Sequence, residues 1–126
     1  MILDNPKYQG LKAIGYWKSK YEPDLPDVHQ YLSPIPLPGY VKTAVVAYLQ
    51  ESNPQVQVFE RWRGWSSCRV CGQVNGSVCL TDGTYVWPEG LAHYVEAHDL
   101  DLHEEFLDHI SRQRIAAIKD DDEDCQ

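Results

Sequence analysis

The chain has 126 residues, of which 43% are hydrophobic, so it is long enough for one domain with a modest core and is not expected to be disordered throughout. Its formal net charge is −8, and five of its 19 acidic residues form a run at positions 120–124. The other 14 acidic residues face 11 basic ones, which argues against nucleic-acid binding, because clustered Lys and Arg supply most of the affinity for phosphate.

The sequence holds no apolar run long enough for a signal peptide or for a membrane-spanning helix. We therefore expect a soluble cytoplasmic protein that does not bind membranes, and we leave its oligomeric state open. Despite the overall negative charge, a local basic patch could still form from Arg61, Arg63 and Arg69.

Residues 1–38 hold six of the eight prolines, which disfavour long helices and central strands. We expect an extended arm over residues 1–37, whose rings pack across the body. The alternative is a flexible leader that docks only on a partner. The aromatic residues concerned are Tyr8, Tyr16, Trp17, Tyr21 and Tyr31.

A helix is predicted over residues 38–51, with Pro38 near its first turn and Asn53-Pro54 ending it. Its apolar face comprises Val41, Ala44, Val45, Tyr48 and Leu49. The alternation over residues 55–65 then predicts a strand. One side of that strand carries Val56, Val58, Glu60 and Trp62.

Two turn dipeptides follow, Asn75-Gly76 and Asp82-Gly83, and the second lies between two strand-like runs and predicts a hairpin. Pro88 opens a short helix that we expect to end near His98. A capping box from Asp101 to Glu104 predicts a last helix over residues 101–119, followed by an acidic tail over 120–126. The residues expected to face inward from it are Leu102, Phe106, Ile110 and Ile118.

These elements predict an α+β fold with a small antiparallel sheet, a zinc knuckle, three helices and the irregular N-terminal arm. We expect one domain over residues 1–119, in which residues 56–98 form the zinc module.

The clearest chemical pattern is a Cys-x-x-Cys-Gly turn followed by two histidines: Cys68, Cys71, His93 and His98. Two thiolates and two imidazoles are a typical ligand set for tetrahedral zinc, and the spacing favours a metal over disulfides. Four ligands leave no position for a reacting water, so we expect structural Zn2+ rather than a catalytic ion. Five residues of ideal helix rotate a side chain by about 140° net, so the helix must loosen or end at His98.

Several other residues allow more than one interpretation. Cys79 is either a substitute ligand or a buried small hydrophobe, and Cys125 is expected to be a free thiol. Were one Cys displaced, Glu89 or Glu96 could act as a general base. His29, His103 and His109 are expected to be solvated. Trp62, Trp65 and Trp87 form either the hydrophobic shell of the metal site or an aromatic wall for a ligand.

The order of strand, Cys pair, strand and helix with two His resembles the Cys2His2 zinc finger from Phe59 to His98. The interval between Cys71 and His93 is 21 residues, whereas a usual finger has about 12. The exposed acids expected on this helix, Glu89, Glu96 and Asp99, would repel phosphate.

A second stretch runs from Trp62 to Gly72 and continues through Asn75-Gly76-Ser77, Leu80-Thr81-Asp82-Gly83 and Tyr85 to Glu96. It resembles a family of small uncharacterised bacterial proteins, a likeness that implies a metal site and a bacterial cytoplasmic setting but no activity. We therefore expect a zinc-stabilised module that binds a protein partner. The alternatives are a nucleic-acid-binding modified finger and a zinc-dependent hydrolase.

Overall fold

The computed structural model describes residues 6–19 and 22–124, apart from the side chains of residue 63 and residues 116–124. It has the predicted α+β class. The strands are β1 (Lys12–Ala13), β2 (Gln57–Ser67), β3 (Val74–Thr81) and β4 (Tyr85–Pro88). The helices are α1 (Gly39–Tyr48), α2 (Leu91–His98) and α3 (Glu104–Asp124), with short 3-10 turns η2 (Pro6–Tyr8) and η3 (Val28–Tyr31).

The four strands form one sheet in the order β1-β4-β3-β2. β2, β3 and β4 are antiparallel, as predicted, and the Asp82-Gly83 turn joins β3 to β4. The N-terminal arm adds an unpredicted feature, because β1 pairs in parallel with β4 and makes the sheet mixed. This strand lies at the sheet edge, where a proline-rich segment is tolerated.

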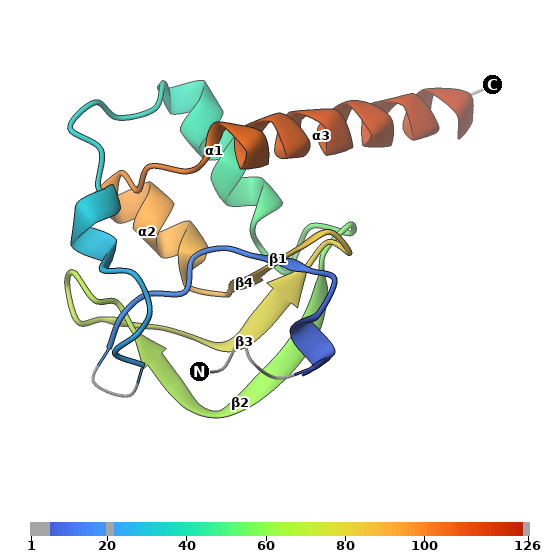
Figure 1. The fold of residues 1–126 in the computed structure, drawn as a ribbon. Coiled ribbons are helices and arrows are strands. Elements are labelled where there is room, and N and C mark those ends of the chain that lie inside the picture. The colour runs from blue at the N-terminus through green and yellow to red at the C-terminus, as the bar shows by residue number, and fades with distance from the viewer. Residues whose placement is uncertain (1–5, 20–21, 125–126) are drawn as a thin grey trace.

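The two faces of the sheet are covered by different parts of the chain. All three α-helices lie on one side of it (Figure 1). Side chains alternate along the strands, so Leu80 and Trp87 join the helices in the larger core, whereas Cys79 and Val86 join the arm in a smaller one. The arm residues in the smaller core are Tyr8, Tyr16 and Leu25. Packing of the arm's rings on the body, rather than a loose leader, is therefore confirmed for Tyr8, Tyr16, Trp17 and Tyr31, while Tyr21 lies outside the described residues.

Two details of the strands differ from expectation. Asn75-Gly76 is not a turn but lies inside β3, where the register with β2 shifts between Ser66 and Ser67. A second irregularity lies between Val58 and Glu60, and Trp62 packs with Phe59 in the smaller core instead of sharing a face with Val58. The physical reason is that an extra residue in one strand reverses the faces of the residues that follow.

The helix boundaries also differ. α1 ends at Tyr48, before Asn53-Pro54, and the Asn53 side chain donates to the Tyr48 carbonyl at 2.9 Å. α3 begins at Glu104 rather than at Asp101, because the segment before it is held extended by a β-bridge between Leu100 and Leu32 and by the Asp101 N–H, which donates to the Tyr31 carbonyl.

Leu102, Phe106 and Ile110 are buried, as expected. The side chain of Ile118 is outside the described part. α3 continues through Asp124 into the predicted acidic tail, since neither Gly nor Pro interrupts it, and its far end extends away from the body (Figure 1).

Candidate metal centre

The two cysteines lie in the turn that joins β2 to β3. The Cys68 N–H donates to the Gln73 carbonyl at 2.8 Å, and the Gly72 N–H returns to the Cys68 carbonyl at 2.9 Å. Gly72 has a φ of +79°, a left-handed conformation that favours glycine. Gly72 thus closes the turn from Cys68 to Gln73, which we call the knuckle, as the sequence predicted.

The backbone of this turn also directs two N–H groups at a sulfur atom. The N–H groups of Val70 and Cys71 point at Cys68 Sγ, at 3.4 and 3.5 Å. The thiolate is the form of cysteine that binds a metal. Cys68 itself is buried, whereas Cys71 is exposed at the rim.

The histidines come from α2, whose last turn is wider than an ideal α-helical turn. The Asp99 N–H bonds to the Tyr94 carbonyl five residues back, and Asp99 has a left-handed φ of +50°. A wider turn rotates the chain by less per residue, so His98 lies closer to the face of His93 than in an ideal helix. The two imidazole centroids are 5.1 Å apart. The predicted end of the helix at His98 is confirmed.

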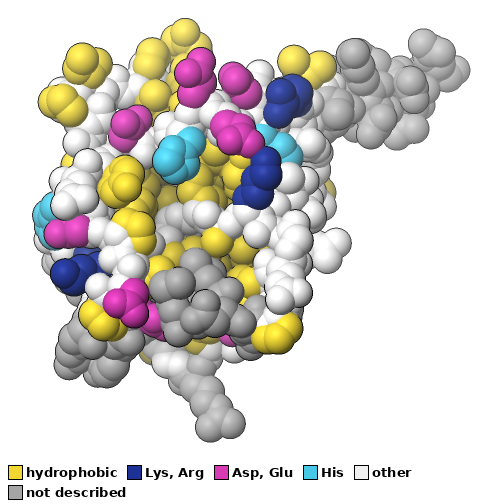
Figure 2. Space-filling view, in the orientation of Figure 1, with side chains coloured by type: hydrophobic (Ala, Val, Ile, Leu, Met, Phe, Trp, Pro, Cys, Tyr) yellow, Lys and Arg dark blue, Asp and Glu magenta, His cyan; other side chains and the backbone are white. Residues whose placement is uncertain are grey.

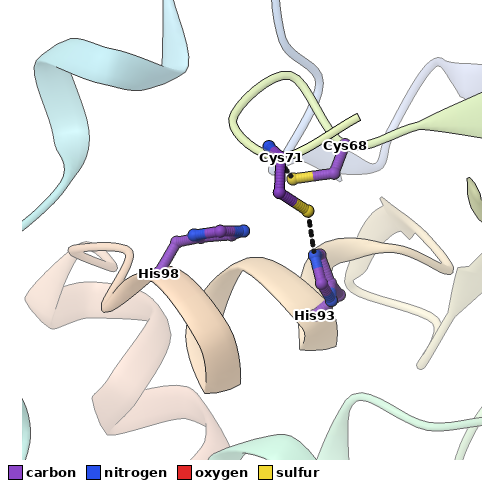
Figure 3. A group of neighbouring side chains, drawn as sticks. All are labelled: Cys68, Cys71, His93 and His98. Atoms are coloured by element: carbon purple, nitrogen blue, oxygen red, sulfur yellow. Dashed lines mark hydrogen bonds between the residues drawn. The ribbon is translucent and has the colours of Figure 1, made fainter. Parts of the chain in front are cut away.

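The four side chains meet at one place (Figure 3). One ligand atom from each of Cys68, Cys71, His93 and His98 lies within 4.8 Å of all the others, and Cys71 Sγ is 3.4 Å from His93 Nε2. In tetrahedral zinc sites with bonds of about 2.3 Å to sulfur and 2.0 Å to nitrogen, ligand atoms lie about 3.3 to 3.8 Å apart. These four residues could therefore hold a metal ion after movements of about 1 Å.

The state of His98 fits a metal ligand. Its Nε2 is buried and has no hydrogen-bond partner among the described residues, an arrangement that a bound cation would satisfy. Burial, together with the nearby His93, lowers the pKa of His98. A lowered pKa favours neutral imidazole, which is the form that binds a metal.

Tyr94 fastens the knuckle to α2, a role that the sequence analysis missed. Its hydroxyl accepts the Arg69 N–H at 2.7 Å, and its ring packs edge-on against Trp17. Burial raises the pKa of Tyr94. A tyrosine one residue after a predicted ligand, on a helix facing the knuckle, was the available signal. The positions of the tryptophans in the sequence do not indicate this role of Tyr94.

The remaining cysteines and acids lie outside this group. Cys79 is fully buried and accepts a hydrogen bond from the Tyr16 hydroxyl at 3.2 Å, so its prediction as a buried residue is confirmed. Burial raises the pKa of its thiol. Cys125 lies outside the described residues. The Glu89 carboxylate accepts the Ser77 N–H at 2.9 Å, whereas Glu96 is exposed.

Of the three histidines predicted to be solvated, one is not. His29 and His103 are exposed, but His109 is buried, and its Nε2 lies 2.7 Å from Asp82 Oδ2. The Tyr48 hydroxyl donates to the same oxygen at 2.5 Å. α3 packs over the β3–β4 turn, which places His109 on its inner side. Its spacing of three residues from Phe106 was the signal for that orientation.

The tryptophans do not form a common shell around the cluster. Trp87 is buried in the larger core, where its indole N–H donates to the Leu49 carbonyl at 3.0 Å. Trp65 is 72% exposed, and Trp62 packs in the smaller core. The ring that contacts both histidines is that of Tyr94.

Comparisons of this chain with protein-family models, curated proteins and solved structures found no match. The resemblance to a bacterial family stays a prediction. Within the described part of the chain, no helix is both long and apolar enough to cross a membrane.

Proposed function

We propose that Cys68, Cys71, His93 and His98 bind one zinc ion in a structural role, and that the protein is a small module that binds another protein. The observation that carries the zinc proposal is the meeting of two thiols and two imidazoles from separate elements. Such a set fills all four positions of a tetrahedral ion. A reducing compartment such as the cytoplasm would keep both sulfurs available.

When bound, zinc would supply a crosslink between the β2–β3 turn and α2. Apparent binding free energies of structural zinc are about 10 to 16 kcal/mol, comparable to the whole stability of a domain. The chain's own residues prepare this crosslink: the N–H groups of Val70 and Cys71 face the Cys68 sulfur, and Tyr94 holds the backbone at Arg69.

The protein-binding part of the proposal is supported by the surface beside the knuckle. Trp65 near the end of β2 and Val74 at the start of β3 are 72% and 63% exposed. Exposed aromatic residues at a rigid position are typical anchors of protein interfaces. The overall negative charge would favour a partner with a basic surface.

The charge distribution supports a protein rather than a nucleic acid as the partner. On the face shown in Figure 2, acidic, basic and histidine side chains are scattered among hydrophobic ones, without a continuous basic patch. Near the metal centre, Glu96 is exposed and Asp99 forms an ion pair with Lys42 at 2.5 Å. Steep salt-dependent binding to mixed-sequence DNA or RNA would contradict this choice.

Metal analysis of the purified chain tests the zinc proposal. We expect one zinc per chain, and we expect cobalt substitution to give the absorption of a tetrahedral site with two sulfur ligands. Cys71→Ser and His98→Gln should lower the zinc content, whereas His103→Gln, at an exposed histidine, should not. A metal content near zero in protein purified under reducing conditions would overturn the proposal.

Crosslinking in the native cell tests the partner proposal. The double variant Trp65→Ser/Val74→Ser should lose a protein that the wild type captures. Ile35→Ser, at a similarly exposed hydrophobic residue, is the matched control and should retain it. Equal capture by all three chains would contradict a role for this surface.

A further inference from the structure

A cavity of about 400 Å³ opens beside the metal centre. Its volume lies within the range of about 300 to 1,000 Å³ that is usual for small-molecule sites. The rings that line it come from distant parts of the chain: Tyr16, Trp17, Trp62, Trp65 and Tyr94. Flat aromatic walls favour a flat apolar ligand, because rings stack face to face or pack edge to face.

Four residues of the lining carry buried polar atoms that lack partners. These atoms, which have no hydrogen-bond partner within the described residues, are Trp17 Nε1, Trp62 Nε1, Arg69 Nε and Asn75 Oδ1. Buried polar groups are ordinarily paired, and leaving one unpaired costs about 1 to 3 kcal/mol. All four residues line one cavity, so small side-chain movements would let these atoms meet a ligand with polar groups of its own.

These atoms are held in place by their neighbours. Trp17 packs against Tyr94, and Arg69 Nη1 donates to the Ser66 hydroxyl at 3.3 Å and to the Ser67 carbonyl. The Asn75 amide lies directly over Gly90, where an added Cβ would be only 2.5 Å from Asn75 Cγ. The polar atoms are therefore fixed by the knuckle, by the arm and by the start of α2.

The donors define the chemistry of the ligand. Trp17 and Arg69 both offer an N–H, and Arg69 carries a positive charge with no carboxylate within ion-pair distance among the described residues. A carboxylate is the natural acceptor for such a pair. The geometry points to a binding site for a small aromatic acid, with its ring between the aromatic walls and its carboxylate at Arg69. This inference goes beyond the proposed function and needs no protein partner.

The same walls could suit a quaternary ammonium ion through cation–π contacts, but the charges oppose it. Arg69 would repel a cation, and the unpaired N–H groups would stay unsatisfied. Glu22 also lies in the lining, and its backbone N–H bonds to Ser19 Oγ at 3.2 Å. We therefore place the carboxylate at the Arg69 end.

Calorimetry on the full, zinc-loaded chain tests the site with 2-naphthoate and the uncharged 2-naphthamide. We expect one naphthoate per chain, bound at least about tenfold more tightly than naphthamide. Arg69→Met keeps much of the aliphatic stem and should remove this preference. Trp17→Phe keeps a ring but deletes the N–H, so it should weaken the binding of naphthoate by about fivefold.

Arg61→Met, at an exposed arginine outside the lining, is the matched control and should bind naphthoate like the wild type. Zinc content identifies variants that have lost their fold. Equal binding of naphthoate and naphthamide, preferential binding of tetramethylammonium, or no naphthoate binding to the zinc-loaded wild type would overturn the inference. Because none of these results depends on a captured protein, they are separable from failure of the protein-partner part of the proposed function.

A small aromatic acid and the C-terminus of a peptide ending in an aromatic residue both carry a ring and a carboxylate. A peptide ending in tryptophan, with a free or an amidated terminus, distinguishes the two sources. Tighter binding of the free-terminus peptide than of naphthoate assigns the ligand to a chain end, and the reverse order assigns it to a small molecule. Either order supports the site if amidation weakens the peptide, and amidation without effect contradicts it.

Discussion

The two ends of β3 are fastened to helices in different ways. At its start, the Cys68–Gln73 turn faces α2 through two cysteines and two histidines that could hold a metal ion. At its end, the turn at Asp82 faces α1 and α3 through hydrogen bonds to Tyr48 and His109. The first connection would depend on a metal ion, whereas the second uses only groups of the chain.

The burial of the two connections differs as well. The Asp82 and His109 side chains are 3% and 8% exposed, while Cys71 lies at the surface. A buried carboxylate must have its hydrogen bonds supplied by the protein, and Asp82 also accepts the N–H groups of Thr84 and Tyr85, at 3.0 and 2.9 Å. A metal ion bound at the first connection would be open to solvent beside Cys71, whereas the second connection is closed to solvent.

The largest effect is expected from breaking the metal end. Chelation of zinc, or the variant Cys71→Ser, should remove a contribution of about 10 kcal/mol or more and so unfold the region around α2. Thermal unfolding and near-ultraviolet circular dichroism measure this loss. Restoring zinc to the chelated wild type should restore the fold, and equal melting temperatures with and without metal would contradict the expectation.

A smaller but still large loss of stability is expected from a substitution at Asp82, at the other end of β3. Asp82→Asn keeps the shape but puts an amide where a carboxylate accepts four hydrogen bonds, so unfolding should become easier by about 3 to 5 kcal/mol. Denaturant titration measures it. Zinc stoichiometry should stay at the wild-type value, and a loss of zinc in this variant would show that the two ends are coupled.

The pH dependence sharpens the same comparison. Burial tends to raise the pKa of Asp82, but hydrogen bonds from Tyr48, Tyr85, Thr84 and His109 outweigh it and hold that pKa below its ordinary value. A lowered folded-state pKa contributes stability above the unfolded pKa of about 3.9, and this stability is lost as pH falls through the folded value.

The difference in unfolding free energy between wild type and Asp82→Asn should therefore be full above about pH 5 and shrink below about pH 4. Taking the difference removes the acid sensitivity that both chains share through their metal ligands. Acid denaturant titrations measure it, and a difference that grows toward low pH would contradict the assignment.

The smallest effects are expected from a matched pair of glycines, one in each turn. Gly72 and Gly83 have φ values of +79° and +94°, and an added Cβ would meet no atom within 4 Å at either position. Alanine should therefore cost only backbone strain, about 1 to 2 kcal/mol, at each. Gly72→Ala should also weaken zinc binding in a competition titration, whereas Gly83→Ala should not.

Local patterns predicted much of what is close in sequence. The Asp82-Gly83 hairpin, the knuckle and the end of α2 at His98 follow from short-range turn and helix rules, and they bring three segments into the predicted order. The boundaries of α1 and α3 were displaced because long-range contacts compete there. The Leu49 carbonyl, just after α1, accepts the Trp87 indole N–H, and Leu100, just before α3, pairs with Leu32.

The sequence by itself determined the α+β class and the four candidate ligands, because residue type and spacing limit how a short chain segment can turn. Only the tertiary structure decided that the arm adds a parallel strand, that His109 is buried against Asp82, and that the cavity brings Trp17, Arg69 and Asn75 together. Those contacts join residues tens of positions apart, and they depend on how whole layers pack rather than on any local pattern.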